Sequence, residues 1–187
     1  MKTFKTAVIG CGMISKNHFK ALKNVENAEC VVACDIRPER AVAAAETYGI
    51  PHTETEYHRV LDNPEIDVVH ICLPHYLHAQ VAIEANYSDA ALNVNALSEH
   101  FDRPAPFVSR YFKEMNGTNL TQYIHKVRLE HVKEKLLQDE KLETIAITCG
   151  FGSLRSFLRI FKQYEGVTPT QYRELHSKKE ETTNENI

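Results

Sequence analysis

The distribution of apolar residues changes near Glu84–Tyr87, and this change limits how the chain can fold. Before it, short apolar runs alternate with stretches of helical periodicity. After it, amphipathic segments follow one another without a convincing strand. Alternating strands and helices predict a parallel sheet, whereas successive helices predict an all-α module. We therefore expect an α/β domain over residues 1–85 and an all-α domain over residues 86–176.

Three apolar runs in the first part are predicted strands: Thr6–Gly10, Glu29–Asp35 and Asp67–Pro74. The intervening segments SKNHFKALKN and PERAVAAAETYG have helical periodicity, and Gly49 is placed to end the second of them. This order predicts a partial Rossmann fold, a three-stranded parallel βαβαβ sheet. In such a sheet we expect strand Thr6–Gly10 to have one unpaired edge, through which the chain could form a homodimer.

A glycine turn joins the first predicted strand to the first predicted helix. Gly10 permits the tight turn, and Gly12 lets a pyrophosphate approach the backbone at a helix N-terminus. Asp35 ends the second strand about 20 residues beyond the motif, where a carboxylate accepts hydrogen bonds from an adenosine ribose and favours NAD. The residues expected to contact the cofactor here are Gly10, Gly12, Met13, Ile14, Asp35 and Arg37. A glycine turn that binds nothing is the alternative.

The motifs AVIGCGMIS, VVACDIRPERA and DVVHICLPHYLHAQVAIEA resemble the N-terminus of the glucose–fructose oxidoreductase and inositol dehydrogenase family (Gfo/Idh/MocA type). The resemblance implies a NAD-binding domain in which Pro74 and His78 lie near the nicotinamide. It stops at about Ala85, and the family's next strand, its Glu-Lys-Pro with the catalytic lysine, and its substrate domain have no counterpart here. We therefore expect a truncated domain with no catalytic residue and no enzyme activity. An NAD(P)-dependent oxidoreductase of this family is the alternative.

The second part contains a repeated motif. Arg110–Lys113 (RYFK) is followed by Gly117, and Arg159–Lys162 (RIFK) by Gly166, at an offset of 49 residues. A short apolar helix and a tight turn are expected before each copy. Short helix, turn and longer helix is the helix-turn-helix pattern, and its repetition predicts two such units. The segment Thr118–Gln138 between them is predicted to form one long connecting helix.

The two longer helices are each expected to have an aromatic face and a basic face. Val108 and Phe112 in the first helix, and Phe157 and Phe161 in the second, are predicted to point inward. The outward residues expected to contact DNA are Pro106, Ser109, Arg110, Lys113, Arg155, Ser156, Arg159 and Lys162. Arg can pair with guanine in the major groove, and Lys can neutralise phosphates. The connecting helix would hold the two at a fixed separation, and successive major grooves on one face of DNA lie about one turn apart, roughly 34 Å.

Residues 87–176 resemble the DNA-binding domain of AraC-type transcription regulators, in the motifs LSEHF, RYFKEMNG, YIHKVRLEHVKEKLL, IAITCGF and SFLRIFKQYEGVTPTQYR. The resemblance implies sequence-specific binding of double-stranded DNA. The base contacts that it implies come from Ser109, Arg110, Leu154, Arg155, Ser156 and Arg159. The family usually has glycine at 102 and a Ser/Thr cap at 104, where this chain has Asp102 and Pro104. Loss of that cap costs about 1 kcal/mol, so the first unit is expected to bind DNA more weakly.

Charge and residue content bear on which partners, compartment and metal sites we expect for this chain. The net charge of −3 argues against a general attraction to nucleic acid, and residues 87–176 carry 12 Lys and Arg against 11 Asp and Glu. Five cysteines without a C-x-x-C pair indicate reduced thiols and a cytoplasmic protein. No apolar run approaches the roughly 20 residues that span a membrane. His75 and His78 have no further ligand at matching spacing, so no metal site is expected.

The C-terminal segment SKKEETTNENI, residues 177–187, has too little apolar content to pack and is predicted to be a disordered tail. The two resemblances together suggest a chimeric chain, a fusion of parts from two families. A third class of function stays open, an interaction module whose helical part binds another protein. Salt dependence distinguishes the two kinds of binding, because phosphate contacts make log affinity fall linearly with log salt concentration.

Overall fold

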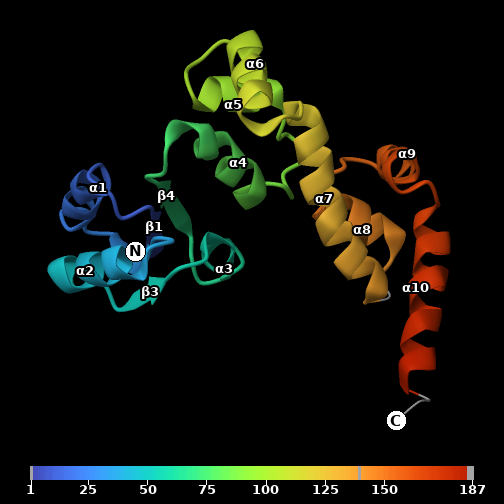
Figure 1. Cartoon of the computed structure of the whole chain (residues 1–187), viewed down its shortest axis with the longest axis horizontal. Helices are drawn as coiled ribbons and strands as arrows, with labels where there is room; N and C mark the ends of the chain where they lie inside the picture. The colour runs from blue at the N-terminus through green and yellow to red at the C-terminus, as the bar shows by residue number, and fades with distance from the viewer. Residues whose placement is uncertain (1, 139, 185–187) are drawn as a thin grey trace. The chain divides into compact units, whose positions relative to one another are not determined.

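A computed structural model describes residues 2–138 and 140–184 of the chain, with side chains described as far as His176 (Figure 1). The chain divides into two compact units, the first ending at Val81 and the second starting at Ala82. The division falls inside helix α4 (His75–Ala85), slightly before the boundary expected after Ala85.

The first unit is built on a four-stranded parallel sheet in the order β3-β2-β1-β4 (Figure 1). Its strands are β1 (Phe4–Ile9), β2 (Ala28–Cys34), β3 (His52–Glu54) and β4 (Val68–Ile71). The helices between them are α1 (Ser15–Leu22), α2 (Pro38–Tyr48) and α3 (Tyr57–Leu61). The α/β class is confirmed, but the sheet has four strands rather than three. The additional strand, β3, consists of His-Thr-Glu and lacks the apolar run that marks the others.

Strand β1 lies inside the sheet, paired with β2 on one side and with β4 on the other. The prediction that strand Thr6–Gly10 has an unpaired edge is therefore wrong. The chain passes from β3 through α3 to the far side of β1, so that β4 covers the edge expected to be open. Among the described residues, the outer edges of the sheet belong to β3 and β4.

Helices cover both faces of this sheet, and each face has its own core. The core on the side of α1 and α2 consists of Val8, Phe19, Leu22, Ala33, Ala44 and Ile50. The core on the side of α3 and α4 consists of Ala7, Ile9, Val32, Cys34, Val60 and Val81. Because successive side chains of a strand point to opposite faces and both faces are buried, β1 has the continuous apolar sequence from which it was predicted.

The second unit contains two successive helix-turn-helix units. The first consists of α5 (Val94–His100) and α6 (Ala105–Asn116), and the second of α8 (Leu142–Thr148) and α9 (Leu154–Glu165). Helix α7 (Leu120–Leu137) connects them and α10 (Pro169–Asn184) follows. The short helices have 7 residues each and the long ones 12. The duplication predicted from the repeated RYFK and RIFK motifs is confirmed.

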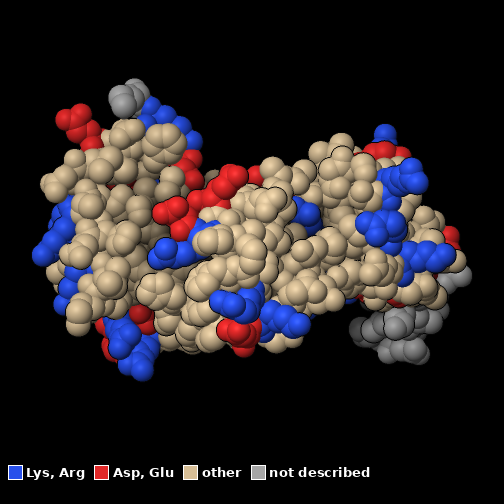
Figure 2. Space-filling model, turned by 90° about the horizontal axis from the view of Figure 1, so that it is seen from above, with Lys and Arg blue, Asp and Glu red and all other residues tan. Residues whose placement is uncertain are grey.

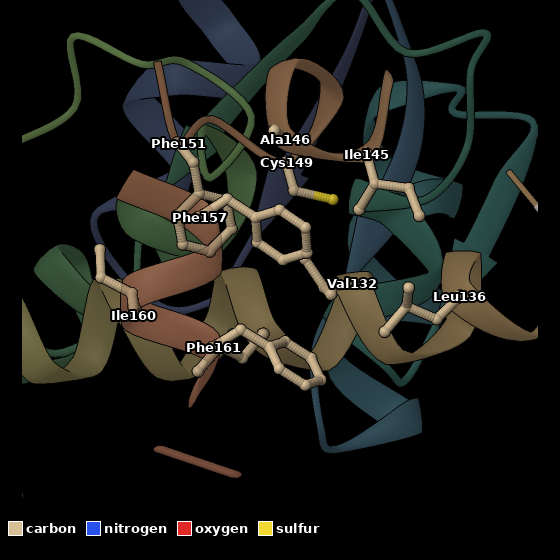
Figure 3. Close-up of a cluster of buried hydrophobic side chains, with 10 residues drawn as sticks. Val132, Leu136, Ile145, Ala146, Cys149, Phe151, Phe157, Ile160 and Phe161 are labelled. Atoms are coloured by element: carbon tan, nitrogen blue, oxygen red, sulfur yellow. The ribbon is translucent and has the colours of Figure 1, made fainter. Parts of the chain in front are cut away.

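The second helix-turn-helix unit packs on α7 through an apolar core rich in aromatic residues (Figure 3). Phe157 and Phe161 of α9 are fully buried, with ring centroids 5.8 Å apart in an edge-to-face arrangement. The residues labelled around them are Val132, Leu136, Ile145, Ala146, Cys149, Phe151 and Ile160. Phe157 and Phe161 are one helical turn apart, so burying them turns the opposite face of α9 to solvent.

A buried arginine connects α7 to the segment that precedes α5. Arg128 donates from Nε to the carbonyl of Tyr87 at 2.9 Å, and from a terminal nitrogen to the carbonyl of Asp89 at 2.8 Å. The turn after α8 lies against the same place. A side chain at Gly150, where φ is 75°, would meet the Tyr87 carbonyl oxygen at 2.3 Å. Arg128 and Gly150 together hold the segment from Tyr87 to Asp89 against the second helix-turn-helix unit.

Helix α10 continues to Asn184, over most of the segment 177–187 that was predicted to be disordered. Its Lys- and Glu-rich composition favours helix even without apolar residues to pack, which is the physical reason for the difference. Residues 185–187 lie outside the described part of the chain. Within the described residues, no helix is both long enough and apolar enough to cross a membrane.

Candidate functional sites

Helix α9 presents a basic face opposite its buried aromatic face. Arg155, Arg159 and Lys162 are exposed, as the helical periodicity predicted. The helix begins at a Ser153 N-cap, whose Oγ accepts a hydrogen bond from the Ser156 amide at 3.2 Å. It ends at Gly166 in the left-handed conformation. These caps fix both ends of the helix and so hold the basic residues on one surface.

Two residues that the resemblance assigns to base contacts are less exposed than the basic residues of α9. Leu154 is half-buried and packs against the aromatic core of the second unit. Ser156 is half-buried, and the Ser153 hydroxyl donates to its Oγ at 3.1 Å. Both belong to the first turn of α9, where Leu154 packs on the core and the amide of Ser156 donates to the N-cap serine.

Helix α6 repeats the arrangement of α9 but lacks a side-chain cap at its N-terminus. Pro106, Arg110 and Lys113 are exposed, while Ser109 is half-buried. Arg110 Nε lies 3.9 Å from Glu114 Oε1, but both side chains are mostly exposed, so this ion pair contributes little to stability and leaves the arginine accessible. No side chain caps the helix at Pro104, in contrast to Ser153 in α9.

Asp102, in the turn before α6, has a φ of 50° and is the only described residue other than glycine with a positive φ. We expect Asp102→Gly to raise the free energy of unfolding of the second unit by up to about 1 kcal/mol, because glycine adopts this conformation without steric cost. Urea unfolding followed by circular dichroism measures the change. Gln138→Gly is the control, because Gln138 ends α7 with φ at −87° and glycine should be destabilising there. A loss of stability in both variants would contradict the argument.

One hollow of about 470 Å³ borders both long helices. Ser109 of α6 and Gln163 and Tyr164 of α9 line it, and the first turns of α7 form its floor through Thr121, Gln122 and His125. Ser109 directly precedes Arg110, and Gln163 directly follows Lys162. On each long helix, the residue that lines the hollow is thus next in sequence to an exposed basic residue. In the space-filling view, several Lys and Arg side chains stand on the right-hand part of the molecule, with Asp and Glu side chains beside some of them (Figure 2).

The carboxyl edge of the sheet in the first unit carries the glycine turn. Gly10 has a φ of 94°, and a side chain there would lie 2.6 Å from the Cys72 carbonyl oxygen, so the turn requires glycine. Nothing lies within 4 Å of a Cβ placed on Gly12, which leaves the backbone there open to a ligand. The Ser15 hydroxyl donates to the Gly12 carbonyl at 2.7 Å and closes the turn into α1.

Asp35 is 7% exposed, and its carboxylate braces the glycine turn. It accepts hydrogen bonds from the amide of Cys11 at 2.8 Å and from the amide of Arg37 at 2.9 Å. Burial, and then the charge of Asp35, raise the pKa of the Cys11 thiol to about 12. Both effects disfavour the thiolate, which is the nucleophilic form of cysteine.

Large apolar side chains stand in solvent around this edge. Met13 is 85% exposed, Ile14 65% and Ile36 86%. A bound adenosine would cover such side chains, because the flat face of its adenine ring can pack against apolar groups. Ile36 was not among the predicted contacts, although a large apolar residue directly after the acid at the end of a strand was a signal that could have identified it.

The predicted nicotinamide end is formed by the start of α4. Pro74 is exposed, and the Nε2 atom of the half-buried His78 lies 2.8 Å from the Leu73 carbonyl oxygen. His75 and His78 have stacked rings with centroids 5.7 Å apart. Within the part of the chain that the structure describes, no group of three or more His, Cys, Asp or Glu residues is arranged to hold a metal ion.

His18 of α1 and His70 of β4 meet with their Nδ1 atoms 3.4 Å apart. Burial, and then the charge of His18, lower the pKa of His70. The unfolded chain therefore binds more protons than the folded one at acid pH. The free energy of unfolding of the first unit is expected to fall as the pH decreases below the unfolded histidine pKa, about 6.5.

Amide hydrogen exchange of β1 and β4 at about pH 7.5 and about pH 5.5 measures this loss, after correction for intrinsic exchange rates. In His70→Gln the loss of stability between the two pH values should be smaller than in the wild type. His52→Gln, at an exposed site on β3, should leave it unchanged. The same pH dependence in His70→Gln and in the wild type would contradict the assignment.

Two protein-family models match the chain. Residues 97–175 match a helix-turn-helix domain, and residues 4–95 match the NAD-binding Rossmann fold of an oxidoreductase family. The second match reaches 10 residues beyond Ala85, where the resemblance was expected to stop. Both resemblances drawn from the sequence motifs are confirmed, and the chain joins a helix-turn-helix domain to a partial oxidoreductase domain.

Curated relatives and a solved structure show the same division. The melibiose operon regulatory protein of Escherichia coli is 32% identical over 108 residues, which is 57% of this chain and 36% of that protein. Inositol 2-dehydrogenase of Salmonella paratyphi B is 37% identical over 95 residues, 50% of this chain and 26% of that protein. The C-terminal domain of AraT, a response regulator from Geobacillus stearothermophilus, is 27% identical with a TM-score of 0.53, covering 55% of this chain and 86% of that one. The chain thus spans about a third or less of the length of these two curated relatives.

Proposed function

We propose that this chain is a transcription regulator of AraC type and that residues 86–176 bind double-stranded DNA sequence-specifically. The observation that carries the proposal is the repeated helix-turn-helix unit, whose long helices α6 and α9 both bury an aromatic face and expose a basic one. Similarity of the helical part to the melibiose operon regulatory protein supports it. We further propose that the protein acts in the cytoplasm.

The two long helices would enter successive major grooves. Arg110 of α6 and Arg155 and Arg159 of α9 would reach base edges, because their guanidinium groups are exposed and can pair bidentately with guanine. Lys113 and Lys162, one helical turn further along, would contact phosphates. The proposed contacts that complete the surface are Pro106 and Ser109 of α6, together with the parts of Leu154 and Ser156 that stay exposed in the first turn of α9. Helix α7, with 18 residues, spans about 27 Å and holds the two units apart.

Selection of bound sites from random duplex DNA tests the proposal. We expect the pool to converge on one sequence that has two short conserved blocks separated by about one helical turn. The affinity for that sequence should fall linearly with log salt concentration, because phosphate contacts release counterions. A pool that does not converge at either of two salt concentrations would contradict sequence-specific binding and favour a protein-interaction module.

We also propose that the carboxyl edge of the first unit binds the adenosine and pyrophosphate part of NAD. Three features support it: the open approach to Gly12, the carboxylate of Asp35 beside the turn, and the exposed apolar side chain of Ile36. Bound NAD would supply a nicotinamide beside Pro74 and His78. We propose no hydride transfer, because the chain passes from α4 directly into the helical unit, without the strand and lysine that catalysis requires in the resembling family.

Gly12→Asp is expected to abolish NAD binding measured by calorimetry while leaving the fold intact. A Cβ at Gly12 meets no atom within 4 Å, so the variant should fold, and its carboxylate would repel the pyrophosphate. Val25→Asp adds the same charge to an exposed site before β2, at the amino edge of the sheet, and should bind NAD as the wild type does. Equal NAD affinity in the two variants would contradict the site. Formation of NADH from NAD and a polyol would contradict the absence of catalysis.

A second copy of the chain is the partner that we propose for the outer edge of β4. Val68 at this edge is 41% exposed, and an open edge of a parallel sheet favours pairing with another chain. Sedimentation equilibrium over a range of concentrations tests this, and a monomer throughout that range would contradict it.

A further inference from the structure

The hollow between α6 and α9 has a lining without fixed charge. Its described lining residues include no carboxylate, lysine or arginine, and the polar ones are Ser109, Asn119, Thr121, Gln122, His125, Gln163 and Tyr164. If α6 and α9 occupy successive major grooves, as proposed above, the hollow faces the sugar–phosphate backbone that runs between those grooves. His125 is the side chain of the hollow that can gain a positive charge near neutral pH.

His125 is held in place on the floor of the hollow. It is half-buried on α7, and its Nδ1 atom lies 3.5 Å from the Tyr164 hydroxyl of α9. The two rings meet edge to face, with centroids 5.8 Å apart. This contact reaches from the connecting helix to the second long helix, so the imidazole has a defined position with respect to the basic face of α9.

Burial and nearby positive charges both disfavour the charged form of His125 in the free protein. Burial, and then Arg128 of its own helix and Arg159 of α9, lower the pKa of His125. From α5 and α6 the hollow is lined by Val94 and Ser109, which carry no charge. A phosphodiester in the hollow would reverse this balance, because a nearby negative charge favours the imidazolium.

We propose that His125 takes up a proton when DNA binds and donates a hydrogen bond to a phosphate of the backbone between the two grooves. This inference rests on the proposed DNA-binding function. It adds a contact from the connecting helix to the contacts of α6 and α9, and it couples DNA affinity to pH. One proton taken up on binding tightens the complex as the pH falls, by at most about tenfold per pH unit.

The test is the dissociation constant for a labelled duplex carrying the selected site, measured at fixed salt concentration at about pH 7.5 and about pH 6.0. We expect several-fold tighter binding by the wild type at the lower pH, and in His125→Gln most of that gain should be lost. His125→Lys carries the charge at both pH values, so it should bind at pH 7.5 about as tightly as the wild type binds at pH 6.0.

His131→Gln is the matched control on the same helix. His131 is half-buried, stacks on Tyr87 with ring centroids 3.7 Å apart, and lies 3.8 Å from Glu134. This variant should keep the pH dependence of the wild type. Full pH dependence in His125→Gln, with the selected site still bound, would overturn the inference while the DNA-binding function stands. Absence of any preferred duplex at both pH values would overturn the function and the inference together.

Discussion

Arg159→Ala is expected to weaken binding to the preferred DNA site by about 1–3 kcal/mol, or roughly 5- to 150-fold, and to relax the sequence preference at one base pair. Arg159 lies at the centre of the exposed face of α9, opposite Phe157 and Phe161, where a guanidinium can reach a base edge. Lys162→Ala should instead weaken all sequences evenly and reduce the slope of log affinity against log salt by about one.

Competition binding with a panel of duplexes, each changed at one base pair, separates these two effects. Arg40→Ala removes the same charge from an exposed site on α2, in the first unit, and should leave both affinity and sequence preference unchanged. If neither Arg159→Ala nor Lys162→Ala alters the affinity for the selected site, the assignment of the basic face of α9 is wrong.

Gly150→Ala is expected to destabilise the second unit by several kcal/mol, a larger loss than most single substitutions cause. A left-handed conformation costs a residue with a Cβ about 1–2 kcal/mol, and φ is 75° at this position. The larger effect is steric, because the new Cβ would lie 2.3 Å from the Tyr87 carbonyl oxygen and 3.0 Å from Arg128 Nε. Relief of that overlap would break the hydrogen bond between those two groups and leave a buried guanidinium short of acceptors.

The second unit provides a matched control for the conformational part of this loss. Gly166 has a φ of 76°, and a Cβ there would meet nothing within 4 Å. Gly166→Ala should therefore lose only the conformational part, about 1–2 kcal/mol. Urea unfolding followed by circular dichroism compares the two variants. Equal losses in Gly150→Ala and Gly166→Ala would show that the contact with Tyr87 and Arg128 contributes nothing.

Much of the candidate DNA-binding surface was predictable because it depends on helical periodicity. Phe157 and Phe161 are one turn apart, so the position of Arg159 on the opposite face follows from their burial. Leu154 was less predictable. It lies in the first turn of α9, and whether such a residue faces a ligand or the core depends on how the helix packs, and here it packs on the core.

The candidate dinucleotide site was predictable to a similar degree. The glycine turn and Asp35 follow from local chain geometry, and the structure places them together at the carboxyl edge of the sheet. That Asp35 braces the Cys11 and Arg37 amides could not be read from the sequence, because it depends on the distance between the ends of two strands. The position of Ile36 directly after Asp35 was a signal in the sequence, but only the fold shows that its side chain is exposed.

The amino-acid sequence alone determined the order of the two units, the duplication of the helix-turn-helix motif and the inward faces of α6 and α9, since each depends on residues within a few turns of one another. The tertiary structure decided which strand lies at the edge of the sheet, and it brought His125 beside Tyr164 and Arg128 beside Tyr87. The two side-chain contacts join residues about 40 positions apart in the sequence. The identity of the edge strand depends on the side of β1 to which the chain crosses after β3. No local pattern encodes such distances, because they follow from how helices and strands pack once they have formed.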